Sequence, residues 1–130
     1  MEAMRRFYAD RLGMPVTAAM DSKITVLAKA WDLPVEQDFK LAIVQFPANF
    51  LIELDEYPPA ATPRPQRPGE LPPGMSMVSF AVDSLDALDL EFLAPPRRIE
   101  AAPYKGRRTA VARGAAGEYI ELVEDPAEGG

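Results

Sequence analysis

The stretch that decides the fold is Phe50-Leu51-Ile52-Glu53-Leu54-Asp55-Glu56-Tyr57. Its aliphatic and aromatic residues, interleaved with acids, predict a β-strand. Side chains alternate across a strand, so one face carries Phe50, Ile52 and Leu54 and the other carries Leu51, Glu53, Asp55 and Tyr57. The first face is apolar enough to lie under a helix, whereas the second has carboxylates where a core strand would have valine or leucine.

The end of the chain repeats this strand. Residues 118–124 read Glu-Tyr-Ile-Glu-Leu-Val-Glu, and both stretches contain the triplet Ile-Glu-Leu, centred on Glu53 and on Glu121. A glutamate between two apolar residues is unusual in a strand, so its recurrence indicates a repeated module.

The composition excludes several classes of function. With 130 residues, of which 48% are hydrophobic and 26% charged, the chain is expected to form a single globular domain over residues 1–130. It contains no cysteine and no histidine, which excludes disulfides, thiol catalysis and most zinc chemistry. The net charge of −6 argues against a nucleic-acid partner.

The sequence also gives no sign of a membrane partner or of secretion. It has no run of about 18 apolar residues, and its N-terminus is a charged amphipathic pattern rather than a signal peptide. A chain without cysteine is compatible with the reducing cytoplasm, which is the location we expect.

The first half, residues 1–57, is predicted to be an αβββ unit. An apolar stripe predicts a helix over residues 2–12, and Gly13 suits its left-handed end. The other expected elements are a strand or broken hairpin over 16–20 and 23–27 that turns at Asp21-Ser22, a helical turn at 28–31, a strand over 39–46, a tight turn at 47–49 and the acidic strand.

A proline-rich connector, residues 58–74, separates this half from the second, residues 75–125, which we predict to be a βαβββ unit. Its expected elements are a strand over 75–83, a helix over 85–93, strands over 99–105 and 109–113, and the terminal acidic strand.

Three stretches carry a family resemblance: residues 7–16, FYADRLGMPV; residues 79–88, SFAVDSLDAL; and residues 117–124, GEYIELVE. Together they resemble the vicinal oxygen chelate superfamily, which includes glyoxalase I, bleomycin-resistance proteins and extradiol dioxygenases. The resemblance implies an α+β fold of two βαβββ units whose curved mixed sheets surround a cleft, with the first strand of unit one missing here.

In metal-dependent members of that superfamily, His and Glu on the first and last strand of each unit bind the metal. Glu53 and Glu121 match the two last-strand ligands, while Met77 stands where many relatives have histidine. The corresponding place in unit one has no residue. Two of the four ligand positions are therefore lost, and we expect neither a bound metal nor another cofactor.

Alternation and the resemblance together predict which residues face the cleft. Glu53 and Glu121 are the candidate catalytic residues, although both could instead be relics exposed in a wet groove. Trp31 could stack on an aromatic ligand or pack in the core. The basic residues between 97 and 113 form either a solvated strand face or an anion site. The expected ligand-binding residues are Gln45, Tyr57, Met77, Ser79, Tyr119 and Trp31.

Three functions are compatible with these residues. The leading hypothesis is metal-free binding of a small cationic or amphipathic molecule in an acid-lined cleft, as in bleomycin-resistance proteins. The second is a lyase or isomerase with Glu53 or Glu121 as general base. The third is a non-catalytic structural or partner-binding domain. The missing strand also predicts a homodimer, because it leaves the edge of the acidic strand unpaired.

Overall fold

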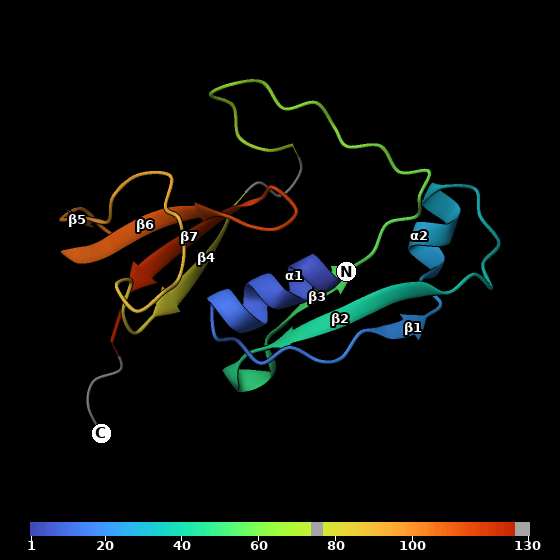
Figure 1. Ribbon diagram of the computed structural model, residues 1–130, viewed down its shortest axis with the longest axis horizontal. Helices are drawn as coiled ribbons and strands as arrows, with labels where there is room; N and C mark the ends of the chain where they lie inside the picture. The colour runs from blue at the N-terminus through green and yellow to red at the C-terminus, as the bar shows by residue number, and fades with distance from the viewer. Residues whose placement is uncertain (74–76, 127–130) are drawn as a thin grey trace. The chain divides into compact units, whose positions relative to one another are not determined.

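The computed structural model describes residues 1–73 and 77–126. The chain divides into two compact units, Met1–Arg64 and a second that begins at Pro65. Each unit is built around one open sheet, of three strands in the first unit and four in the second (Figure 1). Helices are few and occur in the first unit, which confirms the predicted α+β class.

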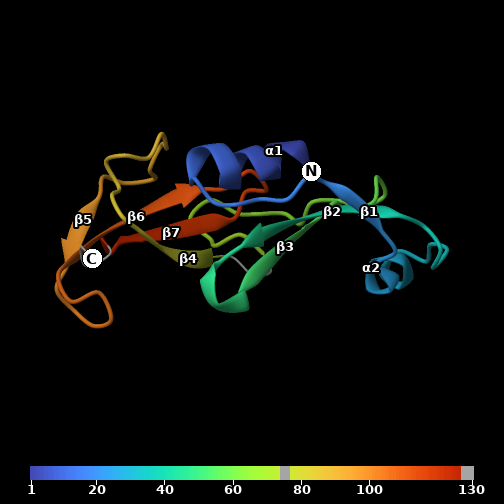
Figure 2. The ribbon, with the colours of Figure 1, turned by 90° about the horizontal axis from the view of Figure 1, so that it is seen from below.

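The chain begins with the predicted helix. α1 spans Glu2–Arg6 and continues directly as a π-helical turn, Phe7–Arg11. Gly13 follows with a φ of +66°, the left-handed conformation that glycine adopts without steric cost. The buried residues of this segment, Tyr8 and Leu12, belong to the predicted apolar stripe. The helix lies along the first sheet (Figure 2).

The first sheet is antiparallel, in the order β1-β2-β3, with β1 at Met20–Ser22, β2 at Phe39–Gln45 and β3 at Leu51–Asp55. A short 3₁₀ turn, Pro47–Asn49, joins β2 to β3. On one face of the sheet every central residue is apolar and buried or half-buried, which fits the prediction that this face supports a helix. These residues are Ala42, Val44, Ile52 and Leu54.

The prediction for residues 16–27 was wrong. β1 spans Met20–Ser22 instead of 16–20, and Val16 forms a separate β-bridge with Val44. Residues 23–27 do not form a strand, because α2 spans Thr25–Ala30, and Asp21-Ser22 is part of β1 rather than a turn. The reason is a helical spacing of apolar residues, which buries one side of α2 against Phe39. The cluster comprises Leu27, Ala28 and Phe39, with Ile24, Trp31 and Leu33 packed around it.

The second sheet has the order β4-β7-β6-β5, in which β4 and β7 are parallel and the other pairs antiparallel. The strands are β4 (Met77–Val82), β5 (Arg97–Ile99), β6 (Arg107–Arg113) and β7 (Tyr119–Glu124). One face of the sheet forms a core, with Phe80, Ala110, Ala112, Ile120 and Leu122 buried. The first and last strands of this unit are therefore direct neighbours.

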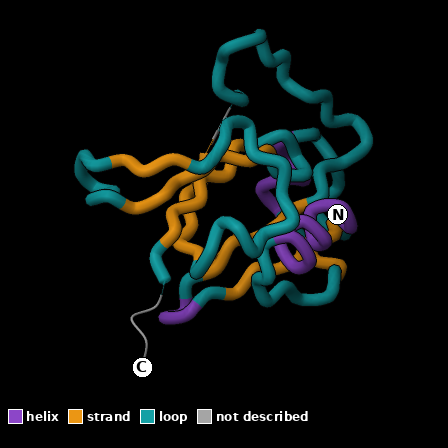
Figure 3. Tube along the Cα trace, turned by 60° about the vertical axis from the view of Figure 1, so that its left-hand side comes forward, coloured by secondary structure: helices purple, strands orange, loops and turns teal. Residues whose placement is uncertain are grey.

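Two predictions in the second unit were wrong. Residues 85–93 form a turn and loop instead of a helix. Of the strand predicted over 99–105, Ile99 alone is in a strand, as the last residue of β5, and residues 102–106 form a turn. Loops and turns make up much of the described chain (Figure 3). The first difference follows from competition with β6. Phe92 forms a β-bridge with Ala112, and the Leu93 amide donates to the Val111 carbonyl, so the segment pairs with a strand instead of coiling.

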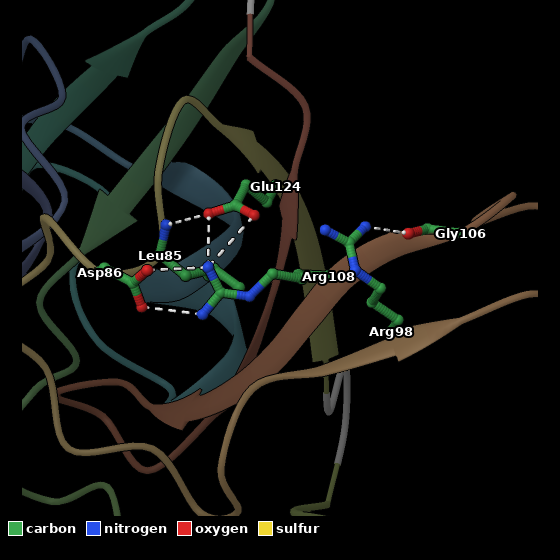
Figure 4. Close-up of polar contacts among 6 residues, drawn as sticks. All are labelled: Leu85, Asp86, Arg98, Gly106, Arg108 and Glu124. Carbon is green, nitrogen blue, oxygen red and sulfur yellow. Dashed lines mark hydrogen bonds and ion pairs between the residues drawn. The ribbon is translucent and has the colours of Figure 1, made fainter.

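Polar contacts hold the start of this loop on the sheet (Figure 4). Arg108 forms two 2.8 Å hydrogen bonds to the two carboxylate oxygens of Asp86 and a third, of 3.2 Å, to Glu124 Oε1. Glu124 Oε1 also accepts a 3.0 Å hydrogen bond from the Leu85 amide. The Leu85 side chain is fully buried. The loop is thus held in place without a helix, by the buried Leu85 side chain and by the bonds of Arg108 to Asp86 and Glu124.

The connector has the irregular structure that its prolines predict. Residues 58–73 form no helix or strand and are nearly all exposed. Within the described part of the chain, no helix is long and apolar enough to cross a membrane.

We predict that Leu85→Ala lowers the free energy of unfolding by about 2–5 kcal/mol, because the substitution leaves a cavity in a fully buried site. Leu93 lies in the same segment but is 51% exposed. Leu93→Ala is therefore the matched control, with an expected change within about 0.5 kcal/mol. Urea denaturation of both variants measures the difference. Equal losses would contradict the anchoring of this loop through Leu85.

Candidate functional site

Two carboxylates of the first unit, Glu53 and Asp55, lie on the face of β3 opposite to Ile52 and Leu54. Glu53 lies across from Ile43 and Asp55 across from Leu41 in the β2–β3 register. Both carboxylates are on exposed residues, as the predicted alternation requires. Since residues two apart on a strand share a face, Glu53 and Asp55 are near neighbours.

This proximity changes the acidity of Asp55. Partial burial, a hydrogen bond with Glu53 and the negative charge of Glu53 together raise the pKa of Asp55 from 3.8 to about 6. Burial is the largest cause, because it disfavours the charged carboxylate, and the hydrogen bond and charge of Glu53 act in the same direction. The sequence analysis named Glu53 and Glu121 as the candidate bases and placed Asp55 on the face of Glu53 without assigning it a role.

Two aromatic rings contact each other, one of them just after the end of β3 in the chain. Tyr57 follows β3 and is 61% exposed, and its ring centroid lies 5.1 Å from that of Trp31. Trp31 ends α2 and also packs against the Leu27 cluster, so its core role and its contact with Tyr57 coexist. Gln45 is exposed at the far end of β2, opposite Leu51.

In the second unit, Glu121 is held by two hydroxyl groups. Ser79 lies directly across from Glu121 in the parallel β4–β7 register and donates a 2.5 Å hydrogen bond to its Oε2. Tyr104, in the turn between β5 and β6, donates a 2.6 Å hydrogen bond to Oε1. We call Ser79, Tyr104 and Glu121 the hydroxyl–carboxylate triad.

The sequence analysis missed Tyr104, because that residue was assigned to a strand and no pattern links it to Glu121. The hydrogen bond to Glu121 raises the pKa of the Tyr104 phenol, since loss of its proton would place two negative charges side by side. The phenol therefore stays protonated at neutral pH.

The other two predicted ligand-binding residues of this unit, Met77 and Tyr119, lie two positions before Ser79 and Glu121 on the same strands. Met77 pairs with Tyr119 and is exposed. The Arg113 guanidinium lies 5.0 Å from the centre of the Tyr119 ring, and its Nη2 donates to the tyrosine hydroxyl at 3.4 Å. Arg107 is paired with Asp125, as Arg108 is with Asp86 and Glu124. Several basic residues of this region are thus bound to their own chain, as expected of a solvated strand face.

The donor set does not fit the metal that the fold resemblance implies. Both oxygens of Glu121 already accept hydroxyl protons, and neither imidazole nor thiolate exists in the sequence. Over residues 1–73 and 77–126, no three acidic side chains gather in a way that could hold a metal ion. A single cleft shared by Glu53 and Glu121 stays a prediction, because the two residues belong to different units.

We predict that the Asp55 carboxyl carbon titrates in NMR spectra with a midpoint of about 6. In Glu53→Gln the midpoint should fall only part of the way to 3.8, because partial burial, the largest cause, remains. The folded state binds this proton more tightly than the unfolded state, so stability should fall as the pH rises from 3.8 to about 6. Asp55→Asn should abolish that fall. A midpoint at or below 3.8 contradicts the pairing.

The comparisons with known proteins concern the fold. No protein-family profile and no curated protein matches the sequence. Among solved structures, a glyoxalase family protein from Bacillus cereus is similar with a TM-score of 0.66 and 17% identity, over 95% of this chain and 85% of that one. A glyoxalase family protein from Enterococcus faecalis has a TM-score of 0.58 and 18% identity, over 95% and 88% of the two chains.

A member of the glyoxalase/bleomycin resistance protein/dioxygenase superfamily from Sphaerobacter thermophilus has a TM-score of 0.54 and 20% identity, over 95% of this chain and 87% of that one. Similarity at such identities establishes the fold. The chain has the fold of the glyoxalase/bleomycin resistance/dioxygenase superfamily, which confirms the resemblance seen in its sequence at that level.

Proposed function

We propose that this chain is a metal-free binding protein that holds a small cationic or amphipathic molecule against its acidic sheet faces. The observation that carries the proposal is the Glu53–Asp55 pair, in which mutual repulsion contributes to the raised pKa of Asp55. A bound cation relieves that repulsion and favours the ionised form of both groups. A cytoplasmic location is part of the proposal, since a chain without cysteine suits a reducing compartment.

The aromatic neighbours support the same class of ligand. A cation over the face of an aromatic ring is attracted by its quadrupole, and an apolar part of the ligand gains from contact with the ring. Tyr57, two residues after Asp55 in the chain, provides such an exposed ring, and the centroid of the Trp31 ring lies 5.1 Å from its centroid. A site for a molecule that is both cationic and amphipathic needs these two kinds of group together.

A second candidate function is a lyase or isomerase with a carboxylate base. It is favoured by the pKa of about 6 at Asp55, because a base that ionises just below neutral pH is well placed to accept a proton. In this function Asp55 is the general base, and Glu53 contributes to the pKa of Asp55 instead of accepting the proton itself. Glu121 is less suited to proton abstraction while both of its oxygens accept hydrogen bonds.

We predict that benzyltrimethylammonium, an aromatic cation without N–H groups, shifts the amide NMR signals of Glu53, Asp55 and Tyr57 in a saturable way. Glu53→Gln and Asp55→Asn should each weaken its binding about 1.5- to 5-fold, the range expected for exposed charge pairs. Glu36→Gln is the matched control, because Glu36 is an exposed acid of the same unit in the loop before β2.

Unchanged affinity in both β3 variants contradicts the electrostatic part of the proposal. The absence of any saturable shift favours a structural or partner-binding domain instead.

The edge of β3 supports a further part of the proposal, a homodimer. β3 is the last strand in the order β1-β2-β3, so within the described residues it pairs with β2 alone. Its first residue, Leu51, is 50% exposed, and Phe50, directly before the strand, is 61% exposed. An open strand edge with exposed apolar residues is a template for another chain.

We therefore predict a mass of about twice 14.3 kDa by light scattering at low micromolar concentration. Leu51→Lys should shift the population toward the monomer, because charged side chains at an edge strand oppose pairing. Lys substitution at Val26, which is 72% exposed on α2, is the control and should leave the mass unchanged. A mass near 14.3 kDa for the unmodified chain contradicts the dimer.

A further inference from the structure

The hydrogen bonds of the hydroxyl–carboxylate triad fix the direction of two protons. A hydroxyl group has one proton to donate and two lone pairs with which to accept. Ser79 and Tyr104 each donate that proton to Glu121, at 2.5 and 2.6 Å. Neither hydroxyl therefore has a proton left for a ligand. Toward a ligand, both present lone pairs alone, and the carboxylate between them is negatively charged.

We propose that the triad is an acceptor-only binding site, which selects ligands carrying two or more N–H donors on one cationic group, such as an amidinium, a guanidinium or a primary ammonium. The inference rests on the proposed function in that the ligand is a small cation. It adds a binding site in the second unit, the chemical group that this site recognises, and a role for Tyr104 in binding it. Glu121 acts here as a positioning residue that orients the two hydroxyl groups.

The surroundings allow such a ligand to enter. Ser79 is exposed, while Tyr104 and Glu121 are half-buried, so the triad is partly dry and still reachable. Two arginines of β6 lie on the same face of the sheet, but both have other partners. Arg107 donates to Asp125 at 3.0 Å, and Arg113 donates to the Gly117 carbonyl and contacts Tyr119.

The same geometry disfavours anions. A carboxylate ligand would bring its own lone pairs against those of two hydroxyls and a charged carboxylate, with no proton between them. The raised pKa of Tyr104 supports this, because at neutral pH the phenol keeps its proton and donates it in a hydrogen bond to Glu121. A quaternary ammonium, which has no N–H, should bind at the triad much more weakly than an amidinium of similar size.

The test is an NMR titration of the ¹⁵N-labelled full chain with three probes: benzamidinium, benzoate and benzyltrimethylammonium. Benzamidinium should shift the amide signals of Ser79, Tyr104 and Glu121 in a saturable way, and the other two probes should not. Tyr104→Phe and Ser79→Ala should each weaken benzamidinium binding about 3- to 10-fold, as expected for the loss of one hydrogen bond.

Glu121→Gln gives the sharpest expectation. A glutamine side chain donates through its amide, so one of the two hydroxyls must become an acceptor and turn its proton outward. Benzamidinium binding should fall about tenfold or more, and benzoate should now bind at the same residues. Glu91→Gln makes the same change of net charge on an exposed loop of this unit and should leave both probes unaffected.

The outcomes separate this inference from the proposed function. Shifts by cations at Glu53 to Tyr57 without shifts at the triad overturn the inference and leave the proposed function standing. Benzoate binding at the triad of the unmodified chain overturns the inference, as does unchanged benzamidinium affinity in Glu121→Gln. If that variant does not fold, unchanged affinity in Tyr104→Phe overturns it equally.

Discussion

The parallel pairing of β4 with β7 is the constraint on which the chemistry of this fold depends. It joins the first and last strands of the second unit and sets Ser79 beside Glu121. The backbone hydrogen bonds of a sheet fix which side chains meet, so the hydroxyl next to this carboxylate is a consequence of register. The first unit has no strand in the equivalent place within the described residues, and β3 ends its sheet.

The two copies of Ile-Glu-Leu consequently have different surroundings. Glu121 has a hydroxyl-bearing strand at its side and a tyrosine above it, so both of its oxygens accept hydrogen bonds. Glu53, on an edge strand, interacts with another acid of its own strand, Asp55. Two hydroxyl groups donate hydrogen bonds to Glu121, whereas Asp55 has its pKa raised by partial burial together with a hydrogen bond from, and the negative charge of, Glu53. One repeated triplet thus produces two electrostatic states.

The sequence predicted the backbone better than it predicted the side-chain surroundings. Alternation within 50–57 and 118–124 gave both acidic strands and the face of each glutamate, because those depend on neighbours in the chain. The helix predicted over 85–93 failed, since the bridge from Phe92 to Ala112 is a contact distant in sequence. Helix α2 was predicted only in part, as a helical turn over 28–31 that followed a strand over 23–27. Its period was visible at Ile24, Leu27, Ala28 and Trp31, but the preceding strand pattern was extended across it.

The contact between Tyr104 and Glu121 is a part of the site that could not be predicted from the sequence. The Tyr104 side chain reaches Glu121 from a turn 17 positions away, and nothing in the spacing of the two residues marks them as partners. The contact exists because the turn at 101–106 returns the chain toward β6, so that Tyr104 stands above the neighbouring β7. Residues that a sheet places in register can be inferred once the strands are known. Residues on the turns between strands cannot, and in this chain one of them determines which hydrogen-bonding groups the carboxylate leaves for a ligand.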